Sequence, residues 1–304
     1  MSPYKARPTL FDWGLLGLLG LIWGAAFFGV EMGLHSLPPL WVSTGRIVLA
    51  AAMLVAIAYI WGDGLPGTRT RQDRRIWLHC IGMGMFTNAI PFSLLSWGQQ
   101  IVSSGFAGIT MAVVPLLVLP LSHFLVPGEH LNRLKIAGFL FGFGGVVLLI
   151  GGDKIFAGQP QTMLLLLAQV ACVTASCCYA IGTIITRLCP PVSTVSYAAC
   201  GLMLGSMMLI PVAIWAEGIP QSANSLAIAG VGYLALFPTA VATILLTILV
   251  RRAGPPFLSL VNYQVPVWAV VIGATVLGEA LPGHFLVALG IILGGLFISR
   301  SRHV

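Results

Sequence analysis

Residues 261–281 read VNYQVPVWAVVIGATVLGEAL, an apolar stretch that carries a proline near its start and a glutamate near its end. Residues 111–131, about 150 positions earlier, read MAVVPLLVLPLSHFLVPGEHL and show the same pattern. The corresponding residues are Pro115 and Pro266, Glu129-His130-Leu131 and Glu279-Ala280-Leu281, Gly144-Gly145 and Gly294-Gly295, and, at a slightly shorter offset, Pro91 and Pro238. Self-similarity at a fixed offset indicates an internal repeat. The chain is therefore predicted to consist of two related halves, residues 1–152 and residues 153–304.

The composition is typical of a membrane protein. Of the 304 residues, 58% are hydrophobic and only 8% are charged. The mean hydropathy is +0.98. Soluble domains contain roughly 25% charged residues, so a water-soluble globular protein is excluded. Because one membrane-spanning helix needs about 20 apolar residues, a chain of this length could hold about ten of them.

The apolar runs predict an all-α membrane protein. The first run lacks a small-residue cleavage site at the length of a secretory signal, so it is expected to be retained. The linkers between runs are too short to hold a separate domain. The ten predicted transmembrane helices lie at about residues 12–34, 39–61, 76–97, 102–126, 134–151, 161–187, 193–216, 225–250, 255–277 and 283–299.

The basic residues predict the orientation of these spans. Five spans in each half is an odd number, so the second half is expected to cross the membrane inverted relative to the first. If the N-terminus is cytoplasmic, every Lys and Arg falls on the cytoplasmic side except Lys154, which is outside, and Arg46, which is within a span. Cytoplasmic loops retain basic residues during insertion, so both termini are predicted to be cytoplasmic. Because the basic residues are scattered over short loops, a nucleic-acid surface is not expected.

Inverted repeats are typical of secondary transporters, whose substrate site lies near the membrane midplane where the repeats meet. Four motifs add to this pattern: Trp23-Gly24-Ala25-Ala26-Phe27, Arg46 with Leu49-Ala50, Pro115 followed by Glu129-His130-Leu131, and Pro266 followed by Leu277-Gly278-Glu279-Ala280-Leu281. The chain resembles the drug/metabolite transporter superfamily in its EamA-type form with ten helices. The resemblance lies in the order and duplication of these motifs and covers nearly the whole chain. The second half has no clear counterpart of the first two motifs, with Tyr179-Ala180 nearest to the first.

The resemblance implies a carrier in the inner (cytoplasmic) membrane with a central cavity lined by the first, third, fourth, sixth, eighth and ninth spans. Within the superfamily the chain is most similar to the aromatic and broad-specificity amino acid exporters. We therefore expect alternating-access export of neutral or aromatic amino acids, or of a broad range of them. The expected partners are a small-molecule substrate and membrane lipid, with no nucleic acid; the oligomeric state is left open, a monomer included.

Four prolines are predicted to break helices near mid-span: Pro91, Pro115, Pro238 and Pro266. In hydrocarbon a freed backbone carbonyl needs compensation or a polar cavity. Pro266 frees the carbonyl of Asn262, and Asn262, Tyr263 and Gln264 supply polar groups around it, so this segment is predicted to bind substrate. Asn88 beside Pro91 and Thr239 beside Pro238 are weaker polar flanks of the same kind. The alternative interpretation is a packing kink whose amides bond neighbouring helices.

Trp23, Tyr179 and Tyr233 are predicted to line the cavity, because mid-span rings with one polar group suit amphipathic solutes. The alternative is that they fill gaps between helices. For Trp268, lipid exposure is an equally good interpretation.

Away from the span ends, two charged residues lie within the predicted spans. Glu31 and Arg46 have similar depths and are predicted to form a structural ion pair. No carboxylate occurs at mid-span, and His79 and His123 lie near the cytoplasmic ends. Transport is therefore expected to proceed without a mid-membrane proton relay, and to favour neutral or zwitterionic solutes.

Pairs of glycines spaced by four residues favour close helix packing: Gly138 with Gly142, Gly201 with Gly205, and Gly290 with Gly294. The first and last pairs are predicted to clamp the fifth and tenth spans within their own halves.

Other classes of function remain as alternatives. Exporters of small amphipathic drugs or other metabolites share this architecture, and a non-transport membrane scaffold is less favoured because it has no need of matched mid-span prolines. An intramembrane enzyme is disfavoured, since the chain has no GxSxG or HExxH motif. The six Cys contain no CxxC pair, so neither a metal site nor a cofactor is predicted.

Overall fold

The computed structural model describes residues 8–157 and 162–299, and in these residues every regular element is helical. Two π-helical segments, η1 and η3, and one 3-10 turn, η2, interrupt the α-helices. The elements in chain order are α1 (Leu10–Gly24), α2 (Ala26–Leu34), α3 (Pro39–Trp61), α4 (Arg71–Met83), η1 (Gly84–Ala89), α5 (Ile90–Gly98), α6 (Ser104–Thr110), η2 (Met111–Val113), α7 (Val114–Leu125), α8 (Arg133–Ala157), α9 (Met163–Leu188), α10 (Thr194–Glu217), α11 (Ser225–Ala235), η3 (Leu236–Val241), α12 (Ala242–Ala253), α13 (Pro255–Leu258), α14 (Val261–Thr275) and α15 (Gly283–Ser299).

An all-helical membrane fold is confirmed, whereas the number of ten spans stays a prediction. Within the described residues, eight continuous helical stretches are long and apolar enough to cross a membrane, and α15 is a shorter apolar helix. The expected ninth span divides into α13 and α14. Between them the amides of Leu260, Asn262 and Tyr263 donate to carbonyls three residues earlier, so the chain is wound more tightly there than in an α-helix.

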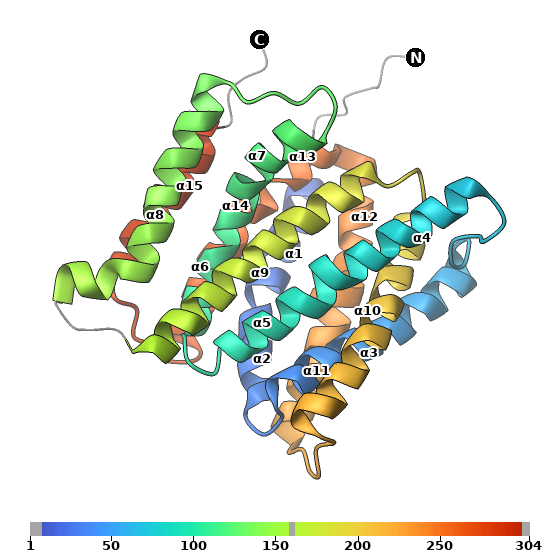
Figure 1. Cartoon of the computed structure of the whole chain (residues 1–304), viewed down its shortest axis with the longest axis horizontal. Helices are drawn as coiled ribbons and strands as arrows, with labels where there is room; N and C mark the ends of the chain where they lie inside the picture. Colours follow the sequence, from blue (N-terminus) through green and yellow to red (C-terminus); the bar gives the residue numbers. More distant parts are fainter. Residues whose placement is uncertain (1–7, 158–161, 300–304) are drawn as a thin grey trace.

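Helices of one half pack against helices of the other (Figure 1). At one edge of the bundle α8 and α15 lie side by side. The cross-half pairs include α3 with α10, α6 with α14, α8 with α15, α2 with α11, and α5 with α9. In each of the first three pairs, the two helices are equivalent elements of the two halves. Each half therefore packs extensively against the other.

Equivalent helices run in opposite directions. The start of α3 meets the end of α10, where the amide of Leu40 donates to Glu217 Oε1 at 3.1 Å. The start of α6 meets the segment after α14, where the amide of Ser104 donates to Glu279 Oε1 at 2.7 Å. This antiparallel relation is the one that an inverted repeat requires.

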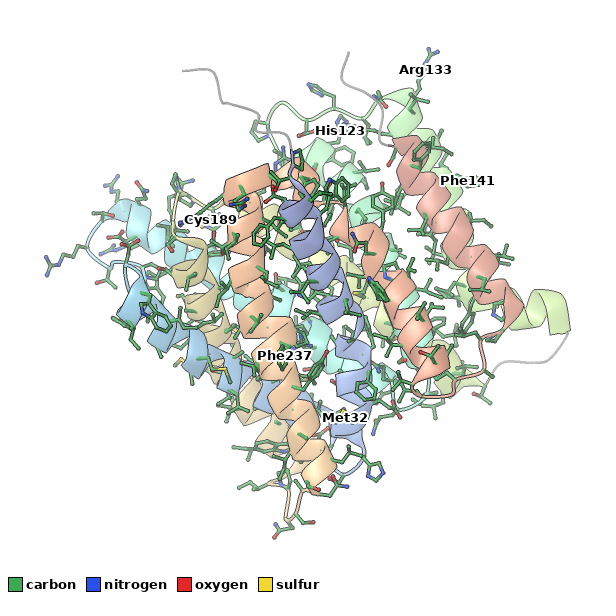
Figure 2. The ribbon with its side chains drawn as sticks, turned by 180° about the vertical axis from the view of Figure 1, so that it is seen from behind. Met32, His123, Arg133, Phe141, Cys189 and Phe237 are labelled. Atoms are coloured by element: carbon green, nitrogen blue, oxygen red, sulfur yellow. The ribbon has the colours of Figure 1, made fainter. Side chains whose placement is uncertain are left out.

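The outer surface is apolar over much of its area, as a lipid-facing surface should be. Phe141 and Phe237 are among the exposed large side chains, and His123 and Arg133 lie at the end of the bundle opposite Met32 (Figure 2). The largest buried cluster of apolar side chains joins α1, α6, α14 and α15. The bundle therefore has an apolar exterior as well as an apolar core.

Three of the four predicted helix-breaking prolines lie at a change of helix type. Pro91 follows η1, Pro115 follows η2, and Pro238 lies within η3. Pro266 lies inside α14, several residues after the division between α13 and α14. Because η1 and η3 occur in the third span of each half, the two halves share the same kind of mid-span irregularity, and π-helical turns are frequent at functional sites.

Candidate functional site

The side chain of Arg46 lies inside the bundle, about a third of the way along α3, and is only 8% exposed. Its Nε donates to the hydroxyl of Thr239 in η3 at 3.0 Å. Its guanidinium carbon lies 3.7 Å from the ring centroid of Phe92 on α5, a cation–π geometry. Arg46 therefore joins three helices that are far apart in the sequence.

The predicted ion pair between Glu31 and Arg46 is absent from the structure. The ion pairs between described residues are Asp12 with Arg252 and Glu129 with Arg187 and Lys135, so neither Glu31 nor Arg46 takes part in one. Glu31 lies on an exposed face of α2, whereas Arg46 is directed toward η3 and α5. Similar depth in the membrane is not sufficient for pairing, because the two residues lie on faces that do not meet.

Trp23 binds the residue next to Thr239. Its indole Nε1 donates to the carbonyl of Pro238 at 3.2 Å. Trp23 and Arg46 belong to the first half of the chain, while Pro238 and Thr239 are consecutive residues of η3 in the second half. Two hydrogen bonds thus link the two halves of the chain at the π-helical segment η3.

Tyr179 and Tyr233, both predicted cavity residues, lie near Arg46. The ring of Tyr179 lies 6.4 Å from that of Phe92, and Tyr179 packs between two buried clusters of apolar side chains. The ring of Tyr233 lies 5.5 Å from that of Phe237. Both tyrosines are half-buried. We call Trp23, Arg46, Phe92, Tyr179, Tyr233 and Thr239 the Arg46 cluster.

Of the other predicted polar residues, Asn88 makes a local contact, whereas Gln264 lies against a helix of the other half. Asn88 is buried in η1, where its amide nitrogen donates to the carbonyl of Met83 at 3.3 Å. This bond compensates a backbone group of the irregular helix. Asn262, Tyr263 and Gln264 are half-buried on α14, and Gln264 lies against Gly20 of α1. Helix α1 therefore contacts two segments of the second half. Gly20 lies against Gln264 of α14, and Trp23, on a neighbouring face of α1, contacts η3.

Phe92 is not among the residues predicted from the sequence, and Thr239 is noted there only as a weaker polar flank of Pro238. Phe92 directly follows Pro91, and Thr239 is the first of three threonines spaced by four residues. Each hydroxyl donates to the backbone of its own helix, with Thr243 bonding Thr239 O at 2.7 Å and Thr247 bonding Thr243 O at 2.8 Å. The regular spacing of these threonines is a further signal for Thr239.

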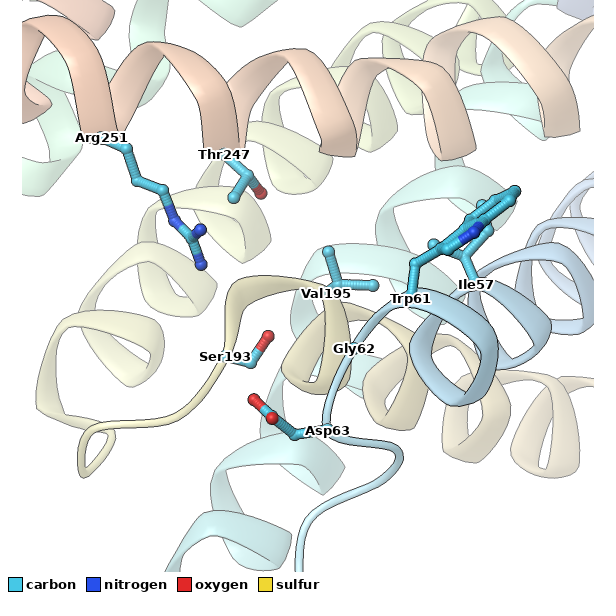
Figure 3. Close-up of a pocket in the computed structure, with 8 residues that line it drawn as sticks. All are labelled: Ile57, Trp61, Gly62, Asp63, Ser193, Val195, Thr247 and Arg251. Atoms are coloured by element: carbon cyan, nitrogen blue, oxygen red, sulfur yellow. The ribbon is translucent and has the colours of Figure 1, made fainter.

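A cavity of about 320 Å³ lies where the end of α3, the start of α10 and the end of α12 meet (Figure 3). Arg251 and Asp63 point toward this space from opposite sides, with Ser193 between them. Thr247 also lines it, so the row of threonines on α12 runs from the cavity to Thr239 and Arg46. The lining residues are Ile57, Trp61, Gly62, Asp63, Ser193, Val195, Thr247 and Arg251.

The arrangement offers one buried cation, several aromatic rings and hydroxyl groups. In the part of the chain that the structure describes, no three His, Cys, Asp or Glu side chains are grouped so that they could hold a metal ion. The chemistry available at mid-span is therefore binding and orientation by hydrogen bonds, charge and aromatic contact.

Comparison with known proteins agrees with this architecture. The EamA-like transporter family matches residues 12–151 and again residues 166–301, one match in each half. The chain is 30% identical to the uncharacterized inner membrane transporter YedA of Escherichia coli (strain K12), over 95% of this chain and 90% of that protein. It is 25% identical to the aromatic amino acid exporter YddG of Ancylobacter novellus, over 94% of this chain and 96% of that protein.

A protein crystal structure of 20% sequence identity superposes with a TM-score of 0.67, covering 97% of this chain and 98% of that chain, which shows a shared fold. The helical stretches and the relatives together identify a multi-pass protein of the inner membrane. The two family matches account for the internal repeat. The chain belongs to the EamA-like transporter family, within the drug/metabolite transporter superfamily.

Proposed function

We propose that the protein exports amino acids, neutral, aromatic or of broad specificity, by alternating access through a central site formed around the Arg46 cluster. The observation that carries this proposal is the pair of cross-half hydrogen bonds, from Trp23 to Pro238 and from Arg46 to Thr239. Alternating access requires one repeat to move against the other around a shared site. Hydrogen bonds that link the halves at an irregular helix are suited to breaking and re-forming during that movement.

The moving units in this proposal are the two halves, residues 1–152 and 153–304. Aromatic side chains support an amphipathic substrate, because Trp23, Tyr179 and Tyr233 combine apolar contact with single polar groups. Asn262, Tyr263 and Gln264 are proposed to complete the site from α14, on the neighbouring face of α1. The similarity to a protein named as an aromatic amino acid exporter supports the same substrate class.

The cavity beside Arg251 is proposed as the cytoplasmic entrance. Its lining contains both a carboxylate and a guanidinium, which suit the ammonium and carboxylate groups of a zwitterion. From there the threonine row leads to Arg46. Since the Arg46 cluster contains no carboxylate or histidine, export is proposed to follow the substrate gradient without a mid-membrane proton relay.

Efflux from proteoliposomes tests the proposal. Vesicles loaded with labelled tryptophan, phenylalanine or leucine should release them only when the protein is present, and a pH gradient should not drive accumulation above equilibrium. Competition by free amino acids, nucleosides and cationic dyes defines the substrate class. Release of dyes with no release of any amino acid would instead favour a drug exporter, and proton-driven accumulation would contradict uniport.

A further inference from the structure

Resting on the proposed function, we infer that Arg46 binds the carboxylate of the transported solute and makes that group a requirement for transport. The substrate class is thereby narrowed to monocarboxylates with an apolar or aromatic body, zwitterionic amino acids among them. Amines and cationic drugs that lack a carboxylate are excluded from the site by the same charge.

The guanidinium of Arg46 has more donors than the surrounding protein satisfies. Arginine carries five N–H donors. Among the described residues, Arg46 has one hydrogen-bond acceptor, the hydroxyl of Thr239, which takes the Nε proton. None of the ion pairs between described residues includes Arg46. The four N–H groups on the two terminal nitrogens therefore have no acceptor from the described part of the protein.

Burial makes this arrangement of Arg46 costly. The residue is 8% exposed and lies within a span, where an unpaired charge is expensive and arginines usually pair. Phe92 covers one face of the guanidinium at 3.7 Å and supplies only part of the missing interaction. A largely buried cation that lacks an anion among the described residues, and whose terminal nitrogens are not among the fully buried unpartnered atoms, is suited to receive an anion from a ligand.

The contacts of the guanidinium also define the direction from which a ligand can bind. With Nε bonded to Thr239 and one face covered by Phe92, the edge that carries both terminal nitrogens is left for a ligand. This edge presents parallel N–H donors in the fork geometry that matches a carboxylate bidentately. Tyr179, whose ring lies 6.4 Å from that of Phe92, and Tyr233, whose ring lies 5.5 Å from that of Phe237, are positioned to contact the body of the solute.

The test compares solutes that share an indole ring. Tryptophan and indole-3-propionate carry a carboxylate, whereas tryptamine and tryptophan amide do not. Wild-type protein in proteoliposomes should release the first two, and the same two should raise its melting temperature in detergent. Tryptamine and tryptophan amide should do neither. Equal transport of tryptophan and tryptamine by wild-type protein would overturn the inference.

Three variants separate binding from structure. Arg46→Gln should weaken the binding of tryptophan at least about thirtyfold and abolish the preference over tryptophan amide, because one partner of a buried charge pair is lost. Arg46→Lys keeps the charge but loses the forked pair of N–H donors, so its affinity for tryptophan should lie between those of the wild type and Arg46→Gln. Arg133→Gln, at an exposed residue at one end of the bundle, is the matched control and should behave as wild type (Figure 2).

The outcomes distinguish this inference from the proposed function. If tryptophan is exported and Arg46→Gln retains the wild-type preference for carboxylates, Arg46 is not the carboxylate site although the export function stands. If no amino acid is exported but indole-3-propionate still stabilises the wild type and not Arg46→Gln, the carboxylate site stands and the proposed function fails. Should Arg46→Gln not fold, the wild-type melting temperatures with the four solutes decide alone.

Discussion

Trp23 links the two halves of the chain through a single hydrogen bond. Its indole N–H donates to Pro238 O, a carbonyl within a π-helical segment. Trp23→Phe keeps the ring and removes the donor, which should cost about 1 kcal/mol, equivalent to about fivefold in a conformational equilibrium. We expect export to slow several-fold at equal expression, measured as efflux from proteoliposomes.

The matched control for this prediction is Trp215→Phe. Trp215 is 88% exposed, so the same change of ring should leave export unaltered. Equal efflux from wild-type and Trp23→Phe protein would show that the bond to Pro238 has no part in transport.

Arg46 illustrates what a residue's position in the sequence can reveal. A charge within an apolar run distinguishes Arg46 from its neighbours on the basis of sequence alone. Its partners cannot be identified in the same way, because Thr239 lies 193 positions away and its hydroxyl resembles many others in the chain. Depth alone suggests Glu31 as the partner, whereas contact depends on the rotation of α2 and α3 about their axes.

Glu279 ties the second half to the first at the start of α6. Its carboxylate accepts from the amides of Ser104 at 2.7 Å and Gly105 at 3.0 Å, while Ser103 accepts from Phe106 at 3.1 Å. The first amides of a helix have no intrahelical acceptor, and a negative charge there also interacts favourably with the helix dipole.

Glu279→Ala should therefore lower the free energy of unfolding by about 1–2 kcal/mol, the range of a lost N-terminal cap. Thermal unfolding in detergent measures the change, and Glu279→Gln should lose less because its amide oxygen can still accept. Asp63→Ala removes an exposed carboxylate and serves as control. A melting temperature for Glu279→Ala equal to that of the control would contradict the capping role.

Glycines hold α8 and α15 together across the two halves, which differs from the prediction of clamps within each half. A Cβ on Gly295 would come 2.5 Å from the carbonyl oxygen of Gly138, so the backbones approach closely there. Gly290 has nothing within 4 Å of such a Cβ, and Gly294 contacts only the ring of Phe141. The spacing of glycines predicted close packing correctly for Gly138 and Gly142 but not for Gly290, and Gly138 packs against α15 of the other half.

Substitution of Gly295 by leucine should force α8 and α15 apart and destabilise the protein by about 1–3 kcal/mol, the usual cost of overpacking. Gly290→Leu introduces the same side chain into open space on the same helix and should be tolerated. Melting temperatures and the yield of monodisperse protein report the difference. Similar behaviour of the two variants would mean that this contact is dispensable.

At the scale of the molecule, the orientation in the membrane follows from the basic residues and can be tested directly. In a variant that lacks the six native cysteines, single cysteines introduced as Arg71→Cys and Arg251→Cys should react with an impermeant maleimide from the cytoplasmic side. Gln221→Cys, between α10 and α11, should react from the opposite side. Labelling of positions 71 and 251 from opposite sides would refute the predicted topology.

The whole-molecule class was decided by quantities that need no tertiary structure. A chain with 8% charged residues cannot cover a soluble surface, and two matched stretches about 150 residues apart imply two related halves. Three of the four mid-span prolines also indicated where helices change type, because proline removes a donor wherever it occurs. These are local or additive properties, so composition and spacing are sufficient to infer them.

The site itself depended on how the halves pack. Trp23 and Arg46 meet Pro238 and Thr239 only because α1 and α3 lie against η3. Asn88 bonds within its own helix, whereas Gln264 lies against Gly20 of α1. Such contacts depend on the rotation and register of neighbouring helices. An apolar sequence is often compatible with more than one rotation and register, so it does not determine these contacts. The sequence alone was enough to infer a membrane transporter with a repeat, whereas the packing of its helices placed the guanidinium of Arg46 at the centre with no ion-pair partner among the described residues.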